Sequence, residues 1–294
     1  MHVVVVGAGS LGSLLGGLLA RTHEVTLVGR DPHMRHVRES GLRVEGAVET
    51  TVRPDARTTL PASADLAVVT VKAYDTATVA RDLAECDLKC VLSLQNGLDN
   101  EATLATSVDA PVLAGTATYG ARLRDPGRVE CTGVGEVVLG APKGGPSSDA
   151  DRVGEAFRAA GIETDVAEDM PRRQWEKLAV NAGINAPTAL ARVENGALVD
   201  GPASDVSRAA ARETARAARE RGVDLSDEAA VSAVRAVAES TAPNHSSMLQ
   251  DVERGRRTEV DSINGAVAQS EADTPVNGTL AGLVRAWERG RGLR

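Results

Sequence analysis

The chain has 294 residues, of which 42% are hydrophobic and 25% are charged. This length is sufficient for two domains with hydrophobic cores, and the composition excludes a globally disordered protein. The 33 basic and 41 acidic residues give a net charge of −8, which argues against nucleic acid or an anionic membrane as the main partner.

The cysteines and the N-terminal residues predict a cytoplasmic protein. The three cysteines, Cys86, Cys90 and Cys131, are sparse, odd in number and without metal-ligand spacing, so we expect reduced thiols and no metal site. The chain opens on a strand pattern instead of a charged leader with an apolar helix, so no signal peptide is expected. No apolar run is long enough to cross a membrane.

The first elements are a strand, a glycine-rich loop and a helix. Residues 2–6 form an apolar run rich in valine, which is typical of a parallel strand buried on both faces. A G-x-G-x-x-G loop follows, and residues 13–21 continue as a helix. Gly7 is expected to allow the tight turn, Gly9 to let a diphosphate approach the backbone, and Gly12 to let helix and strand pack closely. The alternative is a glycine-rich turn that binds nothing. The pattern favours dinucleotide binding by Gly7, Ala8, Gly9, Ser10, Leu11 and Gly12.

The second strand, residues 24–30, bears on which dinucleotide binds. Its carboxyl end meets the adenosine ribose in this fold, where an acidic side chain selects a free 2′-hydroxyl and an arginine accepts a 2′-phosphate. The sequence places Arg30 at the strand tip, and Asp31-Pro32 is typical of the start of the next helix. We therefore predict NADP(H), against the alternative that Arg30 is a solvated loop residue.

Two further buried strands end in polar residues. Residues 65–72 end on Lys72, and residues 89–97 end on Asn96-Gly97. Because ligands lie beyond the carboxyl ends of strands in open α/β sheets, both side chains are candidates for cofactor or substrate contacts. A solvated lysine and a simple turn are the alternatives. Two short strands are expected within residues 42–52, and strands within residues 111–140 are interpreted as an antiparallel extension of the sheet.

After about Asp169 the strand signal stops and helical spacing of Ala, Arg and Glu takes over. We therefore predict a Rossmann-type α/β domain over residues 1–167, followed by an all-α domain over residues 168–294. Helices are expected over residues 203–221 and up to residue 239, the second capped by Ser226. Pro187 is expected to kink or restart the central helix.

That central helix carries an unusual polar row. Lys177, Asn181 and Asn185 lie four residues apart and so share one face of a helix that is otherwise largely apolar and expected to be buried. Only four lysines occur in the chain, so this one is less easily explained by composition. The alternative is a structural hydrogen-bond network. We favour the wall of a polar substrate pocket, with Lys177 as a proton donor.

A second polar segment spans residues 244–266. Asn244 or Ser246 can cap a short helix, and Thr258 can cap the next one, with Glu259 in its first turn. Capping for Ser247 and helix-dipole compensation for Glu259 are the structural alternatives. The arginines at positions 254, 256 and 257 favour a solvated or subunit-facing run over an anion site, which leaves a homodimer open.

Several stretches resemble the ketopantoate reductase family. They are V-V-G-A-G-S-L-G at the start, the strand ending in Lys72, Q-N-G at 95–97, W-E-K-L-A-V-N with I-N following, E-N-G at 194–196, and S-S-M-L-Q-D with T-E-V-D-x-I-N-G. The stretches at 175–185 and 246–265 are specific to the family, whereas the glycine loop is not. Many members read I-N-P-L-T-A, but here Pro187 comes one residue later, and the turn at residues 21–23 is a residue short.

The resemblance implies an enzyme that reduces 2-dehydropantoate (ketopantoate) to (R)-pantoate with NADPH, a step toward pantothenate and coenzyme A. It implies the catalytic residues Lys177, as proton donor, and Glu259, which would also touch the cofactor. It further implies cofactor contacts by Lys72, Ala121 and Asn96, and substrate contacts by Asn96, Asn181, Asn185, Asn195, Asn244 and Ser247.

These expectations give a mechanism and two rivals. The hypothesis places the active site in the cleft between the domains, with hydride passing from nicotinamide to the ketone carbon and Lys177 protonating the oxygen. One rival keeps the fold but reduces another branched 2-keto acid. The other is a redox sensor that binds NADP(H) without turnover, for which the Lys-Asn-Asn face and Glu259 have no evident use.

Overall fold

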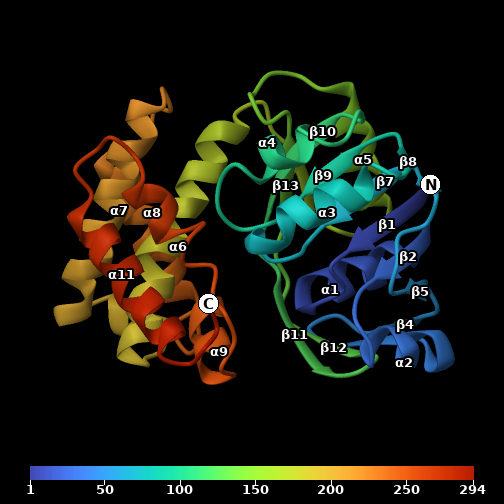
Figure 1. Cartoon of the computed structure of the whole chain (residues 1–294), viewed down its shortest axis with the longest axis horizontal. Coiled ribbons are helices and arrows are strands. Elements are labelled where there is room, and N and C mark those ends of the chain that lie inside the picture. The colour runs from blue at the N-terminus through green and yellow to red at the C-terminus, as the bar shows by residue number, and fades with distance from the viewer. The chain divides into compact units, whose positions relative to one another are not determined.

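The computed structural model describes residues 1–294, which form two compact units. The first comprises Met1–Gln95 and Asp99–Met170, and the second comprises Asn96–Leu98 and Pro171–Arg294. The first is an α/β unit and the second is helical, so the predicted fold class, a Rossmann-type domain followed by an all-α domain, is confirmed (Figure 1).

The first unit is built on an eight-stranded sheet with the order β14-β13-β10-β9-β7-β1-β2-β5. All neighbouring strands pair in parallel except β10 and β13, which are antiparallel. The strands are β1 (His2–Val6), β2 (Glu24–Val28), β5 (Asp55–Arg57), β7 (Leu66–Val69), β9 (Val91–Ser93), β10 (Val112–Ala117), β13 (Val137–Gly140) and β14 (Thr164–Val166).

A second sheet of four strands, in the order β11-β12-β3-β4, lies apart from the main one. It contains β3 (Leu42–Gly46), β4 (Thr50–Val52), β11 (Gly120–Asp125) and β12 (Arg128–Gly133). The prediction that residues 111–140 simply extend the main sheet is therefore wrong in part. Only β10 and β13 join it, because β12 pairs with β3 instead, in a parallel register that the sequence does not reveal. A two-stranded sheet joins β6 (Ser63–Ala64) and β8 (Asp87–Leu88).

Helices cover both faces of the main sheet, which explains the continuous apolar strands. Alternate residues of β1 point into different cores: Val3 and Val5 pack with Leu14 of α1, whereas Val4 and Val6 belong to a second core. The helical elements of this unit are α1 (Ser10–Leu19), α2 (His33–Ser40), η1 (Ala73–Asp75), α3 (Thr76–Leu83), α4 (Asn100–Ala105) and α5 (Ser148–Ala159).

The second unit is a bundle of helices (Figure 1). Its core is rich in alanine and contains side chains from α6, α7, α8 and α11. As predicted, the Ser226 hydroxyl caps α8 by accepting the Ala229 N–H at 3.1 Å. The helices are α6 (Met170–Ala191), η2 (Asn195–Leu198), α7 (Pro202–Glu220), α8 (Asp227–Ser240), α9 (Ser247–Glu253), α10 (Asn264–Ala268) and α11 (Pro275–Arg289).

The long helix α6 continues through Pro187 to Ala191, so the predicted restart of the helix does not occur. A proline has no N–H for the carbonyl four residues earlier, which here belongs to Gly183. Nearby backbone is supported by side chains instead. The Thr188 hydroxyl donates to the Ile184 carbonyl at 2.7 Å, and Asn264 Nδ2 donates to the Ala182 carbonyl at 3.0 Å.

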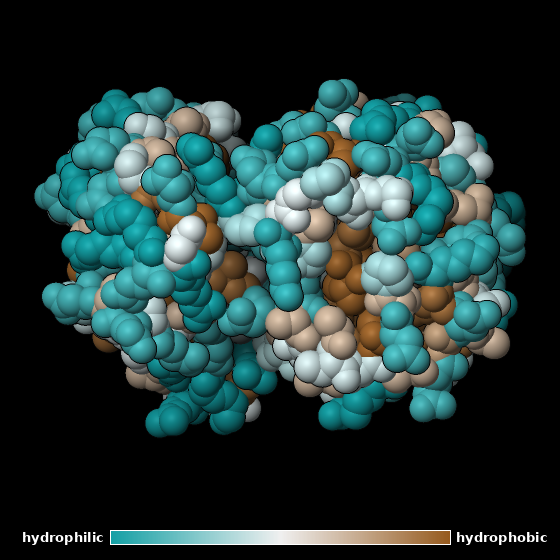
Figure 2. Space-filling view, turned by 90° about the horizontal axis from the view of Figure 1, so that it is seen from above, coloured by the Kyte–Doolittle hydropathy of each residue, from teal (hydrophilic) through white to brown (hydrophobic).

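Hydrophilic side chains cover most of the visible surface, and apolar ones form separate small areas (Figure 2). Exposed ion pairs such as Arg208–Asp205 and Arg235–Glu239 lie on the outer helices, where each contributes little stability. No helix is both long enough and apolar enough to span a membrane.

Candidate functional site

The glycine loop between β1 and α1 has the geometry expected of a diphosphate cradle. Gly7 has a φ of +102°, and a Cβ there would lie 2.7 Å from the Val71 backbone nitrogen. A Cβ on Gly12 would lie 2.4 Å from the Gly7 carbonyl oxygen. At Gly9, by contrast, the nearest atom would be 3.9 Å away. Gly7 and Gly12 are therefore required by close contacts within the protein, whereas Gly9 leaves free space above the backbone.

The N-terminus of α1 is prepared for a negative ligand. Its cap residue, Gly9, offers no side-chain hydrogen bond, and the first turn contains no acidic residue. The helix dipole and the N–H groups of this turn therefore favour an anion at this position. The Ser10 side chain is engaged elsewhere, because its Oγ accepts the Leu123 N–H of β11 at 3.0 Å.

Thr70 supports this loop and was not identified from the sequence. Its hydroxyl lies 2.9 Å from the Gly7 carbonyl oxygen and 3.2 Å from the Val6 carbonyl oxygen. A threonine just beyond β7 has no local sequence signal for this task, because its partners lie more than sixty residues earlier in the chain.

At the carboxyl end of β2, the arginine and the aspartate have different surroundings. The Asp31 carboxylate accepts the Arg35 N–H at 2.9 Å and lies 3.6 Å from the Arg38 guanidinium, so it serves the start of α2. Arg30 is exposed at the strand tip. Arg57, at the end of the neighbouring strand β5, pairs with Val28, and its carbonyl accepts the Gly29 N–H at 3.0 Å. The Arg57 guanidinium is bound to Asp55 at 2.5 Å.

The two polar residues predicted at strand ends both lie three residues beyond their strands. Lys72 follows β7 and precedes η1, and Asn96 follows β9. Asn96 belongs to the helical unit, where its Nδ2 donates to Glu259 Oε2 at 3.2 Å. Gly97, with a φ of +87°, packs closely against the segment that contains Glu259. A Cβ on Gly97 would lie 2.5 Å from the Ser262 carbonyl oxygen. The Asn-Gly pair is therefore more than a turn: it fits the Glu259 segment closely.

Solvent exposure decreases along the polar row of α6, from Lys177 to Asn185. Lys177 and Asn181 are partly exposed, and Asn185 is 4% exposed. The expectation of a buried lysine is wrong, because only the second half of the helix is enclosed on all sides. Asn185 Nδ2 is buried and has no hydrogen-bond partner within the protein. Since an unpaired buried amide is costly, a ligand atom at this position would satisfy it.

The remaining substrate candidates divide by their contacts. Ser246, not Ser247, caps α9, with its Oγ accepting the Leu249 N–H at 3.1 Å. Capping therefore does not account for Ser247, which is exposed at the start of that helix. Asn195 donates from Nδ2 to Thr241 Oγ1 at 2.9 Å, and its backbone N–H donates to the Asn244 carbonyl at 3.0 Å. These bonds join η2 to the loop before α9, although Asn195 Oδ1 is buried without a partner.

Glu259 lies in a turn and not in a helix, so the prediction that Thr258 caps the next helix is wrong. Helix α10 begins only at Asn264. The Thr258 hydroxyl donates instead to Glu288 Oε1 of α11 at 2.6 Å, a partner thirty residues away that the local pattern could not reveal. Glu259 itself is 6% exposed.

The candidates thus form two groups, each within one unit. The glycine loop, Arg30 and Lys72 belong to the α/β unit, together with Ala121, which lies in β11 of the second sheet. The helical unit contains Asn96, Lys177, Asn181, Asn185, Asn195, Asn244, Ser247 and Glu259.

Two family models match the chain, one in each half. Residues 3–144 match the family model "Ketopantoate reductase PanE/ApbA", and residues 169–288 match "Ketopantoate reductase PanE/ApbA C terminal". The chain is 48% identical to a 2-dehydropantoate 2-reductase of Halobacterium salinarum, covering 98% of this chain and 99% of the relative. It is 44% identical to one of Archaeoglobus fulgidus, with 98% of each chain covered.

Two solved structures are also similar. One is a PanE/ApbA family ketopantoate reductase from Ralstonia eutropha, with 32% identity, a TM-score of 0.90 and coverage of 99% of this chain and 100% of that one. The other is a complex of D-mandelate dehydrogenase with NADH, with 25% identity, a TM-score of 0.88 and 99% of each chain covered.

Proposed function

The chain belongs to the ketopantoate reductase family, and from this membership we propose that it reduces 2-dehydropantoate to (R)-pantoate with NADPH. The reaction would serve pantothenate and coenzyme A biosynthesis. Both relatives at over 40% identity carry the name 2-dehydropantoate 2-reductase, and each match spans nearly the whole chain.

The observation that carries the proposal is the polar face of α6. Lys177, Asn181 and Asn185 rise along one side of the helix, and Asn185 ends the row with a buried amide that lacks a protein partner. A 2-keto acid has carbonyl and carboxylate oxygens that such donors can bind. A purely structural network would be expected to satisfy its own donors.

In this proposal each polar side chain has a separate role. Lys177 donates the proton that turns the ketone oxygen into a hydroxyl, and its positive charge stabilises the oxyanion as it develops. Asn181 and Asn185 orient the substrate, and Ser247 binds near its carboxylate. Asn96 and Glu259, 3.2 Å apart, form a hydrogen-bonded pair at the reacting centre.

The cofactor part rests on the α/β unit. The open room over Gly9 and the uncapped start of α1 suit a diphosphate, and reduced nicotinamide supplies the hydride when bound. A preference for NADPH is supported by the exposed Arg30, two residues beyond the end of β2. Asp31, the acid that could select NADH, is engaged with α2.

One similarity favours a second candidate, a reductase of another 2-keto acid. The similar structure named D-mandelate dehydrogenase was solved with NADH, and mandelate is the alcohol form of an aromatic 2-keto acid. We rank this candidate second, because the two relatives above 40% identity are both named for ketopantoate.

A spectrophotometric assay tests the proposal. Purified enzyme is given ketopantoate or 2-ketoisovalerate, each with NADPH or NADH, and the loss of absorbance of the reduced cofactor is followed. We expect the highest kcat/KM with ketopantoate and NADPH. Arg30→Ala should raise the KM for NADPH about tenfold, since it removes a phosphate-binding charge, with little effect on NADH. Arg35→Ala, a nearby exposed arginine, is the control. Faster turnover of 2-ketoisovalerate would favour the second candidate.

A further inference from the structure

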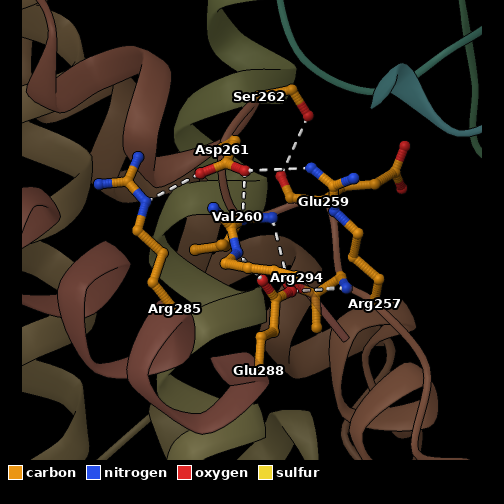
Figure 3. A network of polar contacts seen from close by, with 9 residues as sticks. Arg257, Glu259, Val260, Asp261, Ser262, Arg285, Glu288 and Arg294 are labelled. Atoms are coloured by element: carbon orange, nitrogen blue, oxygen red, sulfur yellow. Dashed lines mark hydrogen bonds and ion pairs between the residues drawn. The ribbon is translucent and has the colours of Figure 1, made fainter. Parts of the chain in front are cut away.

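Residues 258–262 are here called the Glu259 turn. Side chains of helix α11 bind this turn on both sides of Glu259. The turn is not held by regular secondary structure, because α9 ends at Glu253 and α10 starts at Asn264. Backbone hydrogen bonds form the turn itself, such as that from the Ser262 N–H to the Glu259 carbonyl at 3.1 Å. Side chains from the C-terminal part of the chain then hold the turn in place within the helical unit (Figure 3).

On one side, Glu288 of α11 binds the residue immediately before Glu259. Glu288 Oε1 accepts the Thr258 N–H at 2.8 Å and the Thr258 hydroxyl at 2.6 Å. The Glu288 side chain is fully buried, and Thr258 is 1% exposed. A buried carboxylate that accepts two hydrogen bonds from one residue fixes that residue firmly, because moving it would leave the charge unsatisfied.

On the other side, Asp261 is hydrogen-bonded to two arginines, and a third, Arg257, lies 3.6 Å from its Oδ2. Arg285 Nε donates to Asp261 Oδ1 at 2.8 Å, and Arg294 binds Asp261 Oδ2. Burial works against ionisation of Asp261, but the hydrogen bonds from Arg294 and Arg285 outweigh it and hold its pKa below the usual value. The carboxylate is therefore charged at neutral pH, so both bonds are charge-assisted.

Arg294 joins the two sides. Besides binding Asp261, it donates from Nε to Glu288 Oε2 at 2.6 Å and so supplies the counter-charge that the buried carboxylate needs. Arg285 and Glu288 lie three residues apart on one face of α11. Helix α11 and Arg294 together form a clamp around the Glu259 turn (Figure 3).

We propose that Glu288 and Arg294 are positioning residues for catalysis: they act through the turn to place the Glu259 carboxylate against Asn96. This inference rests on the proposed function, in which Glu259 acts at the reacting centre. Neither residue needs to touch substrate or cofactor. A shift of about 1 Å in a positioned group can cost on the order of 10²-fold in rate, so loosening this clamp should lower kcat.

A double-mutant cycle separates positioning from simple structural support. Glu288→Gln and Arg294→Ala are each made in the wild type and in a Glu259→Gln background, and kcat and KM for the substrate that the wild type turns over best are measured together with the melting temperature. If the two residues act through Glu259, each should lower kcat roughly tenfold in the wild type and less than about twofold where Glu259 is already changed. Arg294→Lys should recover part of the loss.

Two matched controls are available in the same unit. Glu213 is another buried glutamate that accepts backbone N–H groups of α11, at 2.9 and 2.8 Å, but at the far end of that helix. Glu213→Gln should lower the melting temperature without coupling to Glu259. Arg291 stacks on Trp287 at 4.8 Å. Arg291→Ala is therefore the control for loss of an arginine next to the clamp.

The outcomes are distinguishable from failure of the proposed function. A wild type that prefers another 2-keto acid changes the substrate but leaves the cycle measurable. Equal fold losses of kcat in both backgrounds would overturn the positioning role, as would a Glu259→Gln enzyme with wild-type kcat. If Glu288→Gln does not fold, Arg294→Ala, whose side chain is one-fifth exposed, still decides the question.

Discussion

The glycine loop and the Glu259 turn are both irregular segments that present candidate functional groups, yet they are held in opposite ways. In the loop, the backbone determines the shape: Gly7 has a positive φ, and Gly12 lies against the Gly7 carbonyl, where no side chain fits. The turn has backbone hydrogen bonds of its own, but charged side chains from α11 and Arg294 hold it in place.

This difference has a physical cause in what each segment presents. A diphosphate is bound by backbone N–H groups, so the loop needs a fixed main chain and no bulk. Proton transfer and orientation of a small acid need particular side chains at particular positions, and those require supporting partners of their own. Substitutions in the two regions should therefore fail in different ways.

The largest effect is expected in the side-chain region. Lys177→Ala removes the proposed proton donor and should lower kcat by roughly two to four orders of magnitude, the usual span for a positioned acid. Affinity for NADPH should change little, because the proposed diphosphate and 2′-phosphate contacts, from the glycine loop and Arg30, belong to the other unit. Lys89→Ala is the control, since Lys89 is exposed and pairs only with Asp65. A Lys177→Ala enzyme with near-normal turnover would remove the assigned role.

In the backbone region, two glycines of one loop should behave differently. Gly9→Ala introduces a Cβ into open room and should leave stability nearly unchanged, while raising the KM for NADPH about tenfold by obstructing the diphosphate. Gly12→Ala would place a Cβ 2.4 Å from the Gly7 carbonyl oxygen and should destabilise the unit by about 1–3 kcal/mol. Urea unfolding and steady-state kinetics measure both effects. Equal effects of the two variants would contradict a loop in which each glycine has its own task.

The difference between local backbone sterics and contacts with distant side chains also explains how much could be predicted from the sequence. The strand, loop and helix at the start follow from local pattern, as do the roles of Gly7 and Gly12, because sterics within a few residues decide them. Polar residues at helical spacing revealed the α6 face. The pairing of β12 with β3 and the bond from Thr258 to Glu288 could not be foreseen, since they join residues far apart in the chain. The expectation that Lys177 is buried failed for a related reason: periodicity gives a face, but not what covers it.

The smallest effect concerns a side chain that supports the backbone-built region. His33 of α2 is 6% exposed, and its Nδ1 accepts the Gly127 N–H at 2.9 Å. The ring therefore carries its proton on Nε2, which lies 2.9 Å from the Ser13 hydroxyl of α1. Protonation of Nδ1 would remove the acceptor of the Gly127 N–H.

Burial lowers the pKa of His33 below 6.5, and the charge of nearby His36 lowers it further. The unfolded chain therefore binds a proton below about pH 6.5 that the folded protein does not. Stability should fall as pH drops from about 6.5 toward the folded pKa, by at most about 1.4 kcal/mol per pH unit. Urea unfolding between pH 5 and 8 should show a shallower pH dependence for His33→Asn than for the wild type, and His36→Asn should keep most of the slope. Parallel curves for His33→Asn and the wild type would mean that proton binding at this ring does not destabilise the helices beside the loop, and that the glycine loop is independent of the charge on His33.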